Sequence, residues 1–350
     1  MKKFAFYLPQ FHEIKENNEW WGKGFTEWVN VKKAKPLYKG HIQPQVPVNG
    51  YYNLLEKKTI INQTKLMNDY GIDGLIYYHY YFEGKKLLEK PAENLLKWKD
   101  INQKFFFCWA NHDWCRSWNN SKEILIKQTY GNEIKWEEHF KYLLKFFKDE
   151  RYEKKDNKPL FMLFNTKFEE KEKMIEYFNK RCKEEGFNGI CVIESYSGQY
   201  INNYELFEKD LSPYSSYVFQ REPMYSQYLY KTKIKYSLVR IINKIKSVLS
   251  VRIYNGDTLL KLACNNLTKN NKIIHGLCFE WDNTPRHGKR GYVITPITKK
   301  MFEKYMSLIN DEEYLFINAW NEWAEGMMLE PTQHNGYKYL EWLKEWSENE

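Results

Sequence analysis

Short apolar runs alternate with amphipathic stretches along the whole chain. The runs are rich in aromatic and aliphatic residues and are a few residues long, which predicts buried strands. The stretches between them repeat apolar residues at helical spacing, most clearly at 56–70, 134–147, 169–185 and 337–346. We predict strands at 4–8, 74–78, 105–109, 160–164, 190–193, 215–219, 274–279 and 314–317.

An alternation of about eight strands with about eight helices is typical of the α/β class and predicts a single (β/α)8 TIM barrel. Nearly every predicted strand becomes polar, aromatic and charged at its carboxyl end. In such a barrel these ends share one rim, and active sites are built there. We therefore expect the functional residues to follow the strands.

A long segment, 10–52, separates the first predicted strand from the helix after it. A connection of this length inside a compact domain usually has a function, and we expect it to cover the mouth of the barrel. No repeat, low-complexity tract or Pro/Ser-rich linker divides the chain. The sequence thus predicts that residues 1–350 form a single catalytic domain with a long first βα loop.

The segment 320–326, after the last predicted strand, is the strongest candidate for chemistry. Glu322 and Glu325 lie three residues apart beside Trp320 and Trp323. Two carboxyl groups confined beside apolar rings do not both ionise at their ordinary pKa values, so one keeps its proton near neutrality. A proton donor beside an acceptor is what cleaving or forming a glycosidic bond requires, and indoles offer faces for a sugar ring. Glu-x-x-Glu without this context is usually a solvated helix face.

Other candidate substrate-binding residues follow the remaining strands or lie in the long first loop. The polar ones supply hydrogen bonds to sugar hydroxyls, and the aromatic ones supply stacking faces. They are Gln10, His12, Glu27, Trp28, Tyr78, His79, Trp109, Asn111, His112, Asp113, Glu280, Asp282 and Asn321.

Structural roles are the alternative for several of these residues. Asn111 and its two neighbours suit a structural hydrogen bond as well as a contact to a sugar. Glu280 suits an ion pair with Arg286 that fixes a loop. A lone histidine beside aromatic residues, such as His79, is more often part of the core than a catalyst.

Composition adds one surface feature. The 28 Tyr, 21 Phe and 13 Trp suit a carbohydrate pocket as well as a large core. The net charge of +9 is concentrated in 231–252, which holds seven basic residues and no acidic one. This segment predicts a basic amphipathic helix, which either contacts an anionic membrane or a lipid-linked glycan, or covers the barrel with a solvated face. Because basic residues do not line the predicted rim, nucleic acid is not an expected partner.

The remaining signals favour a reduced, cytoplasmic enzyme that needs no metal and no cofactor. The six Cys are scattered, and neither metal-ligand spacing nor a phosphate-binding glycine loop is present. The first residues do not resemble a signal peptide, and no apolar run approaches the roughly 18 residues that span a bilayer. Membrane association through 231–252 is the alternative location.

Six motifs resemble, in the same order, those of WbsX-type proteins of bacterial O-antigen and capsule gene clusters. They are Leu8-Pro-Gln-Phe-His12, Gly22-Lys-Gly-Phe-Thr-Glu-Trp28, Lys33-Ala-Lys-Pro36, His41-Ile-Gln-Pro44, Cys108-Trp-Ala-Asn111 and Trp320-Asn-Glu-Trp-Ala-Glu-Gly326. Such proteins are described as glycosyltransferases and are related to glycoside hydrolase family 99. The sequence departs from family 99 hydrolases at Ala324, where they tend to have His, and from WbsX-type chains at His112 and Asp113.

The resemblance implies a (β/α)8 barrel that acts on carbohydrate. Family 99 enzymes are endo-acting α-mannosidases or mannanases that retain anomeric configuration without a protein nucleophile, because the substrate's own 2-hydroxyl attacks the anomeric carbon. By resemblance, Glu322 would be the base that takes the 2-hydroxyl proton. Glu325 would protonate the departing oxygen and then deprotonate the incoming acceptor.

The leading hypothesis is a retaining enzyme that cleaves or transfers a glycosidic linkage in a bacterial surface polysaccharide or its lipid-linked precursor. A nucleotide-sugar-dependent glycosyltransferase of O-antigen (lipopolysaccharide) or capsule biosynthesis is the enzymatic alternative, although the sequence has no Asp-x-Asp motif. A non-catalytic glycan-binding barrel is the alternative of another class. Loss of one acid of the pair would mark it, and both are present.

Overall fold

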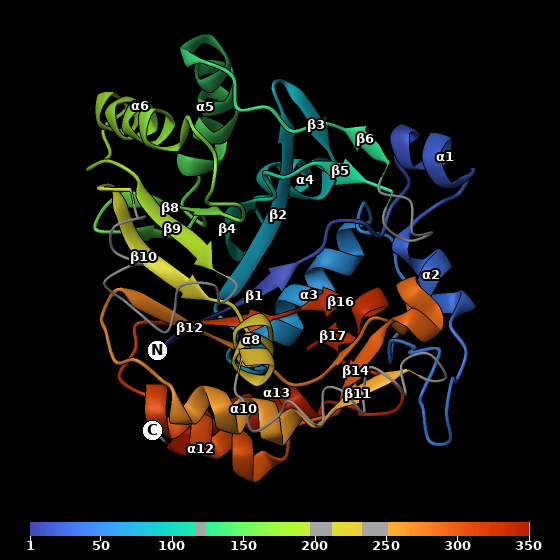
Figure 1. Cartoon of the computed structure of the whole chain (residues 1–350). Helices are drawn as coiled ribbons and strands as arrows, with labels where there is room; N and C mark the ends of the chain where they lie inside the picture. The colour runs from blue at the N-terminus through green and yellow to red at the C-terminus, as the bar shows by residue number, and fades with distance from the viewer. Residues whose placement is uncertain (117–122, 197–211, 233–250, 350) are drawn as a thin grey trace.

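The computed structural model describes residues 1–116, 123–196, 212–232 and 251–349 (Figure 1). Its centre is a closed parallel barrel of eight strands, which confirms the predicted (β/α)8 TIM barrel. Both β2 and β15 pair with β1, and these two pairings close the sheet. The barrel strands are β1 (Lys2–Tyr7), β2 (Gly74–Phe82), β4 (Lys104–Trp109), β8 (Lys158–Leu163), β9 (Cys191–Tyr196), β10 (Ser215–Gln220), β12 (Ile273–Cys278) and β15 (Tyr314–Asn318).

Each barrel strand corresponds to one of the apolar runs. Strands β9, β12 and β15 are buried along their whole length, because helices cover the outer face and side chains of other strands fill the interior. Strand β2 extends beyond its predicted end and turns into β3 (Lys85–Leu87), with which it pairs antiparallel.

The helices cover the barrel with one apolar stripe each. In α12, for example, Phe302, Tyr305, Met306 and Ile309 are buried at helical spacing, and Thr298 caps the first turn. The helices after the barrel strands are α3 (Lys57–Asp69), α4 (Lys90–Lys97), α5 (Glu133–Phe147), α6 (Lys171–Glu184), α8 (Met224–Thr232), α10 (Gly256–Asn265), α12 (Lys299–Ile309) and α13 (Lys338–Asn349).

The long first βα loop contains α1 (Lys15–Trp21) and α2 (Glu27–Lys33). In Figure 1 these helices lie on the right side of the barrel, the side toward which β1 points, together with smaller elements. Those elements are β5 (Trp114–Cys115), β6 (Ile124–Ile126), β11 (Arg252–Tyr254), β13 (Trp281–Asp282), α11 (Thr284–His287), the turn η2 (Gly288–Arg290) and β14 (Tyr292–Ile294). The opposite end has a short β-ribbon of β7 (Lys154–Lys155) with β8.

Most of the predicted basic helix lies outside the described residues, because 233–250 is not among them. Within the described ranges, no helix is both long enough and apolar enough to cross a membrane. All six cysteines are described, and each is a free thiol.

Candidate active site

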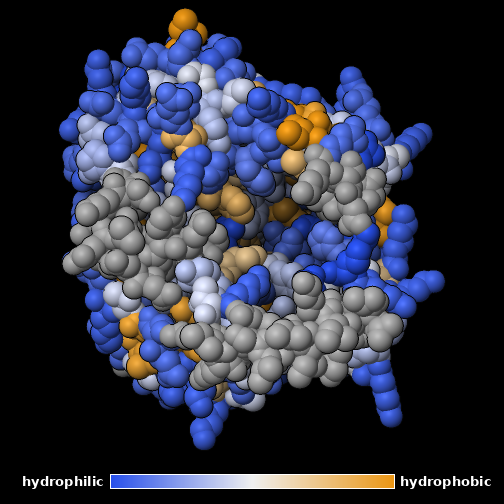
Figure 2. All heavy atoms as spheres, in the orientation of Figure 1, coloured by the Kyte–Doolittle hydropathy of each residue, from blue (hydrophilic) through white to orange (hydrophobic). Residues whose placement is uncertain are grey.

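A cavity of about 560 Å³ lies at the carboxyl ends of the barrel strands. Figure 2 shows that the face drawn there is hollowed near its centre, with hydrophilic and hydrophobic residues side by side. Residues after β1, β4, β8, β10, β12 and β15, and the end of β2, contribute to the lining. Those used below are Gln10, Tyr78, Tyr80, His112, Asp113, Phe164, Arg221, Glu222, Trp281, Arg286, Glu322 and Glu325.

The acid pair lies at this cavity and shares one arginine. Glu322 ends β16 (Asn321–Glu322), and Glu325 ends the single turn η3 (Trp323–Glu325). Arg286 of α11 donates from Nη1 to Glu325 Oε1 and lies with Nη2 3.4 Å from Glu322 Oε2. Its Nε and Nη2 also donate to Oε2 of the buried Glu27, at 3.2 and 3.0 Å. One guanidinium therefore holds three carboxyl groups together.

Backbone geometry after β15 presents both acids to the cavity. Asn321 exchanges two hydrogen bonds with the backbone of Leu8, and these fix the start of the motif against the end of β1. Gly326 has φ +59°, and a Cβ there would lie 2.8 Å from the Asp282 backbone nitrogen. Only glycine combines that φ with so close an approach. The chain then reverses into β17 (Met327–Met328), which pairs with β16.

Burial sets the electrostatics of the acid pair. It raises the pKa of Glu322 well above the usual range, the Glu325 carboxyl raises it further, and Arg286 opposes both. Burial also raises the pKa of Glu27, again against Arg286. The Glu325 side chain is 23% exposed and that of Glu322 8%, so Glu325 is the more accessible of the pair. The cluster thus tends to keep a proton near neutrality, as the sequence predicts.

Four of the predicted substrate-binding residues line the same cavity: Gln10, Tyr78, His112 and Asp113. The His112 ring stacks on Phe164 at 5.0 Å between centroids, and burial lowers its pKa, so it is neutral at physiological pH. The Oδ1 atom of Asp113 accepts a hydrogen bond from the Gln128 backbone. Its other oxygen has no hydrogen bond within the described chain and remains available for a ligand.

His79 and Trp109 do not reach the cavity, contrary to the sequence interpretation. Side chains alternate between the two faces of a strand, so His79 points outward because its neighbour Tyr78 points inward. His79 Nε2 lies 2.9 Å from Nε2 of His139 in α5, and Trp109 Nε1 donates to the Tyr81 carbonyl. Both residues pack between barrel and helix, which is the structural alternative for His79.

The three tryptophans expected to stack on a sugar are part of the core. Trp320 and Trp323 are fully buried, and Trp28 is 5% exposed. Trp323 donates to Glu330 and Trp28 to the Tyr52 carbonyl, so both indole N–H groups bind protein acceptors. The Trp, Tyr and Phe rings that do line the cavity are Trp21, Tyr78, Tyr80, Trp114, Phe164, Trp281 and Tyr292.

Asn111, Asn321 and Asp282 hold the strand ends together. Asn111 exchanges hydrogen bonds with the backbone of Asn165, and Asn321 does the same with Leu8. Asp282 Oδ2 accepts from His41 Nε2 at 2.7 Å and from Gln43 Nε2 at 2.6 Å, and so fastens the long first loop to the end of β12.

Glu280 and His12 are both outside the set that lines the cavity. Glu280 accepts a hydrogen bond from Asn335 Nδ2, whereas Arg286 pairs with Glu27 and the acid pair. The predicted ion pair between Glu280 and Arg286 is thus replaced by another arrangement. Burial raises the pKa of Glu280 to about 7 and lowers that of His12 to about 4.

Sequence reasoning missed two functional candidates, Arg221 and Glu222, and gave Arg286 only a loop-fixing role. All three line the cavity, and the first two directly follow β10. Their position just after a predicted strand could have identified Arg221 and Glu222 as candidates. No cluster of three or more His, Cys, Asp or Glu suited to a metal occurs in the part of the chain that the structure describes.

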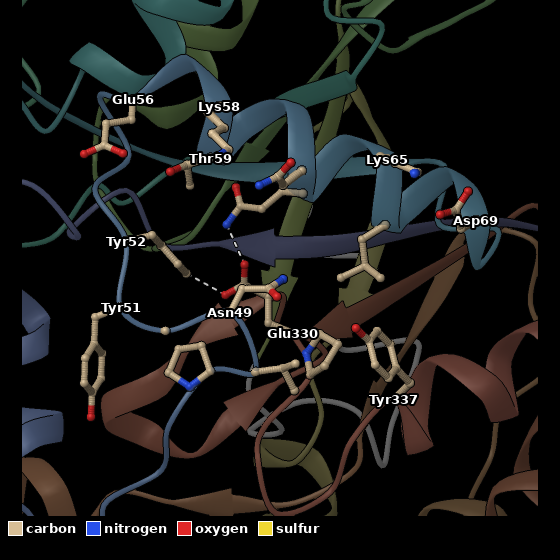
Figure 3. Close-up of a pocket in the computed structure, with 17 residues that line it drawn as sticks. Asn49, Tyr51, Tyr52, Glu56, Lys58, Thr59, Lys65, Asp69, Glu330 and Tyr337 are labelled. Carbon is tan, nitrogen blue, oxygen red and sulfur yellow. Dashed lines mark hydrogen bonds between the residues drawn. The ribbon is translucent and has the colours of Figure 1, made fainter.

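A second cavity, a groove of about 660 Å³, lies outside the barrel between α3, segment 47–52 and Tyr337 (Figure 3). Glu330 forms its floor and accepts hydrogen bonds from Tyr52, Gln63 and Trp323. Burial raises the pKa of Glu330 to about 7, against these donors. Since Trp323 lies between Glu322 and Glu325, Glu330 supports the loop that carries the acid pair.

Solved structures share this barrel fold over nearly the whole chain. A solved structure described as a glycoside hydrolase-like protein matches with a TM-score of 0.64 and 13% identity, over 99% of this chain and 93% of that one. The GH99 endo-α-mannosidase from Bacteroides thetaiotaomicron matches with a TM-score of 0.56 and 12% identity, over 99% and 96%. At identities this low, the structural match shows a shared fold alone.

The model of the family described as Glycosyltransferase WbsX matches residues 3–343, and the chain belongs to that family. The curated "Uncharacterized protein WxcX" from Xanthomonas campestris pv. campestris strain B100 is 28% identical over 352 residues, which cover 96% of this chain and 48% of the relative. The chain thus spans about half the length of the curated relatives it matches. The resemblance to WbsX-type proteins seen in the sequence is confirmed.

Proposed function

We propose that the chain cleaves or transfers a glycosidic linkage and that Glu322 and Glu325 are its catalytic residues. The observation that carries the proposal is the shared arginine: Arg286 holds both acids at one wall of a cavity at the barrel rim. Enzymes that act on glycosides commonly use two carboxyl groups as acid and base, with pKa values shifted by burial and by neighbouring charges. We further propose a bacterial surface polysaccharide or its lipid-linked precursor as substrate, because the motifs resemble those of WbsX-type proteins from O-antigen and capsule gene clusters.

In the proposed reaction, Glu322 takes the proton of the sugar's 2-hydroxyl. The freed oxygen attacks the anomeric carbon, the bond to the leaving group breaks, and Glu325 protonates the departing oxygen. Water or an acceptor sugar then adds to the 1,2-anhydro sugar, gives its proton to Glu325, and leaves O2 to recover the proton from Glu322. Two displacements at the anomeric carbon give net retention of configuration.

The raised pKa of Glu322 supports its role as base, because a carboxylate that binds protons tightly is a stronger base. The greater exposure of Glu325 supports its contact with leaving group and acceptor, which enter from the cavity. Glu27 and Arg286 are positioning residues in this scheme, since they act through the two acids.

The second candidate is transfer from a nucleotide-activated sugar, and the family description favours it. In that reaction Glu322 or Glu325 would deprotonate the acceptor hydroxyl, and a cationic side chain would neutralise the departing diphosphate. The two candidates differ in the donor they consume.

The test compares wild type, Glu322→Gln and Glu325→Gln on α-linked aryl glycosides, oligosaccharides and surface polysaccharides, with NMR detection of the anomeric form of the product. We expect a retained product from wild type and a loss of about 100-fold or more in each variant on unactivated substrates. The exposed Glu313→Gln serves as a control that keeps wild-type activity. Turnover of a nucleotide sugar without glycoside cleavage would establish the second candidate, and binding without any turnover would leave a glycan-binding barrel.

A further inference from the structure

Charge is divided unevenly across the cavity. On one wall Arg286 is surrounded by Glu27, Glu322 and Glu325. On another, Arg221 follows β10, is 9% exposed, and has no carboxylate within salt-bridge distance among the described residues. A buried cation without a counter-ion is costly, and such costs are tolerated mainly at functional sites.

Aromatic rings occupy the faces of the Arg221 guanidinium but leave its hydrogen-bonding edge unused. The Cζ atom lies 4.1 Å from the centroid of Phe164 and 5.3 Å from that of Phe6. Stacking stabilises the positive charge, yet guanidinium N–H groups lie in the plane and still need acceptors. Both Nε and Nη2 are buried and have no hydrogen-bond partner in the described chain.

Elsewhere in the protein that same edge holds a carboxylate. Arg151 donates from Nε and Nη2 to the two oxygens of Asp149 at 2.8 and 2.9 Å. Arg286 uses Nε and Nη2 on Glu27. The Nε and Nη2 edge matches the two oxygens of a carboxylate or a phosphate, and at Arg221 no described residue supplies them.

The groups that face Arg221 do not supply the missing charge. They are Tyr78, Cys108, His112 and Glu322, and the next residue in the chain is Glu222. Burial keeps the tyrosine and cysteine protonated, and His112 is neutral. Burial raises the pKa of Glu222 to about 8, so this carboxyl is mostly protonated at neutral pH, and Glu322 is paired with Arg286.

Other unused polar atoms point to a ligand in the same place. Gln10 Nε2, Glu222 Oε1 and Trp281 Nε1 belong to residues that line the cavity, are buried, and have no hydrogen-bond partner in the described chain. A protonated Glu222 adds one more donor. Donors therefore predominate near Arg221, as a site for an acceptor-rich group requires.

We propose that the cavity binds a sugar residue that carries an anionic group, a carboxylate or a phosphate, and that Arg221 is the residue that recognises it. The anionic group would lie on the Arg221 side while the linkage to be broken lies at Glu322 and Glu325. This inference rests on the proposed function for its choice of a sugar, and it deepens that function by adding the charge of the substrate. Arg221 thereby becomes the specificity determinant of the site.

The test measures binding, which needs no turnover and so gives a result even where the proposed reaction fails. The probes are methyl α-glycosides in the gluco, galacto and manno series, each as the neutral sugar, the hexuronide and the 6-phosphate. Ligand-observed NMR gives dissociation constants for wild type, Arg221→Met, Arg221→Lys and Arg290→Met. Arg290 is exposed on the loop after α11 and serves as the matched control.

We expect wild type and Arg290→Met to prefer one anionic series over its neutral counterpart by about tenfold or more, and less so at high salt. Arg221→Met should lose this preference while it keeps its affinity for the neutral sugar. Arg221→Lys, which keeps the charge but not the planar fork, should retain part of it. Comparison of hexuronides with 6-phosphates distinguishes carboxylate from phosphate.

The proposal is overturned if no anionic probe binds wild type more tightly than its neutral partner in any series. It is also overturned if Arg221→Met binds the anionic probes as well as wild type does. Circular dichroism and melting temperature show which variants are folded. Should Arg221→Met fail to fold, Arg221→Lys decides, because an undiminished preference in that variant contradicts recognition by the fork.

Discussion

At the scale of single residues, Arg286 controls how much negative charge the site holds. Its guanidinium contacts Glu27, Glu322 and Glu325. Burial raises the pKa values of Glu27 and Glu322, and Arg286 opposes both shifts by favouring the carboxylates. An opposite charge within a few ångströms lowers a carboxyl pKa by about 1–3 units. Arg286 therefore lowers the pH at which Glu322 ionises.

Replacement of Arg286 by Gln should raise the pKa of Glu322, because the cation that stabilises the carboxylate is lost while burial and Glu325 remain. Since the base acts when deprotonated, the acidic limb of the kcat/KM profile should move to higher pH by about 1–3 units. A ¹³C NMR titration of the glutamate carboxyls checks the same shift without substrate. Arg290→Gln is the control, and a limb that stays in place or moves to lower pH contradicts the assignment.

The residue scale also shows where sequence reasoning reaches its limit. The pattern at 320–326 predicted the acid pair correctly as neighbours at the rim, because strand and turn together determine their position. It could not predict which way each tryptophan points. The sequence interpretation gave Trp320 and Trp323 faces for a sugar ring, but both side chains are fully buried in the core.

At the scale of elements, the long first loop is fastened to the segment that follows β12, two strands away from β1 in the barrel. His41 and Gln43 both bind Asp282, which lies at the end of the strand that leads to Arg286. Burial raises the pKa of Asp282, but the hydrogen bonds from His41, Thr284 and Gln43 hold it below its ordinary value. The loop thus fixes the element that carries the arginine.

Asp282→Ala should loosen this connection and lower both stability and catalytic efficiency. The variant leaves His41 and Gln43 without their acceptor, and a loss of a charge-assisted hydrogen bond of this kind costs about 1–3 kcal/mol. Urea unfolding measures the stability, and kcat/KM measures the effect on Arg286. Asp257→Ala removes a more exposed carboxylate that binds Thr298 at a distant helix start, and should cost less. Equal losses in both variants would contradict a special role for Asp282.

Elements were predicted from the sequence far better than contacts. Eight apolar runs correspond to the eight barrel strands, because burial on both faces leaves a strong signal in the residues themselves. The contact between His41 and Asp282 spans 241 residues and leaves no periodic trace. The same is true of Arg286 and Glu27, which are 259 residues apart.

At the scale of the whole molecule, buried carboxyls give the fold an unusual pH dependence. Burial raises the pKa of Glu222 to about 8 and that of Glu330 to about 7, whereas an unfolded Glu titrates near 4.3. The folded state therefore binds more protons than the unfolded state between these values. Stability from these groups is complete at low pH and is lost as pH rises through the folded pKa values.

We expect the free energy of unfolding to fall between about pH 6.5 and pH 8, where histidines are largely neutral in both states and these carboxyls decide the slope. Below that window, His12 and His79 oppose the effect, because burial lowers their pKa values to about 4 and about 3. Denaturant titrations at several pH values measure the slope. Glu222→Gln should flatten it, and a wild-type curve that rises through this window would contradict the assignment.

The strand pairing that closes the barrel lies next to the proposed catalytic motif. Strand β15 pairs with β1, Trp320 N donates to the Phe6 carbonyl, and Asn321 binds Leu8, so the residues that close the barrel lead directly into the acid pair. Because β15 is the eighth barrel strand along the chain, the seven strands before it cannot close the barrel or position Glu322 and Glu325 by themselves. Closure of the barrel and assembly of the proposed acid pair are therefore expected to be a single folding event, because the same backbone segment makes both.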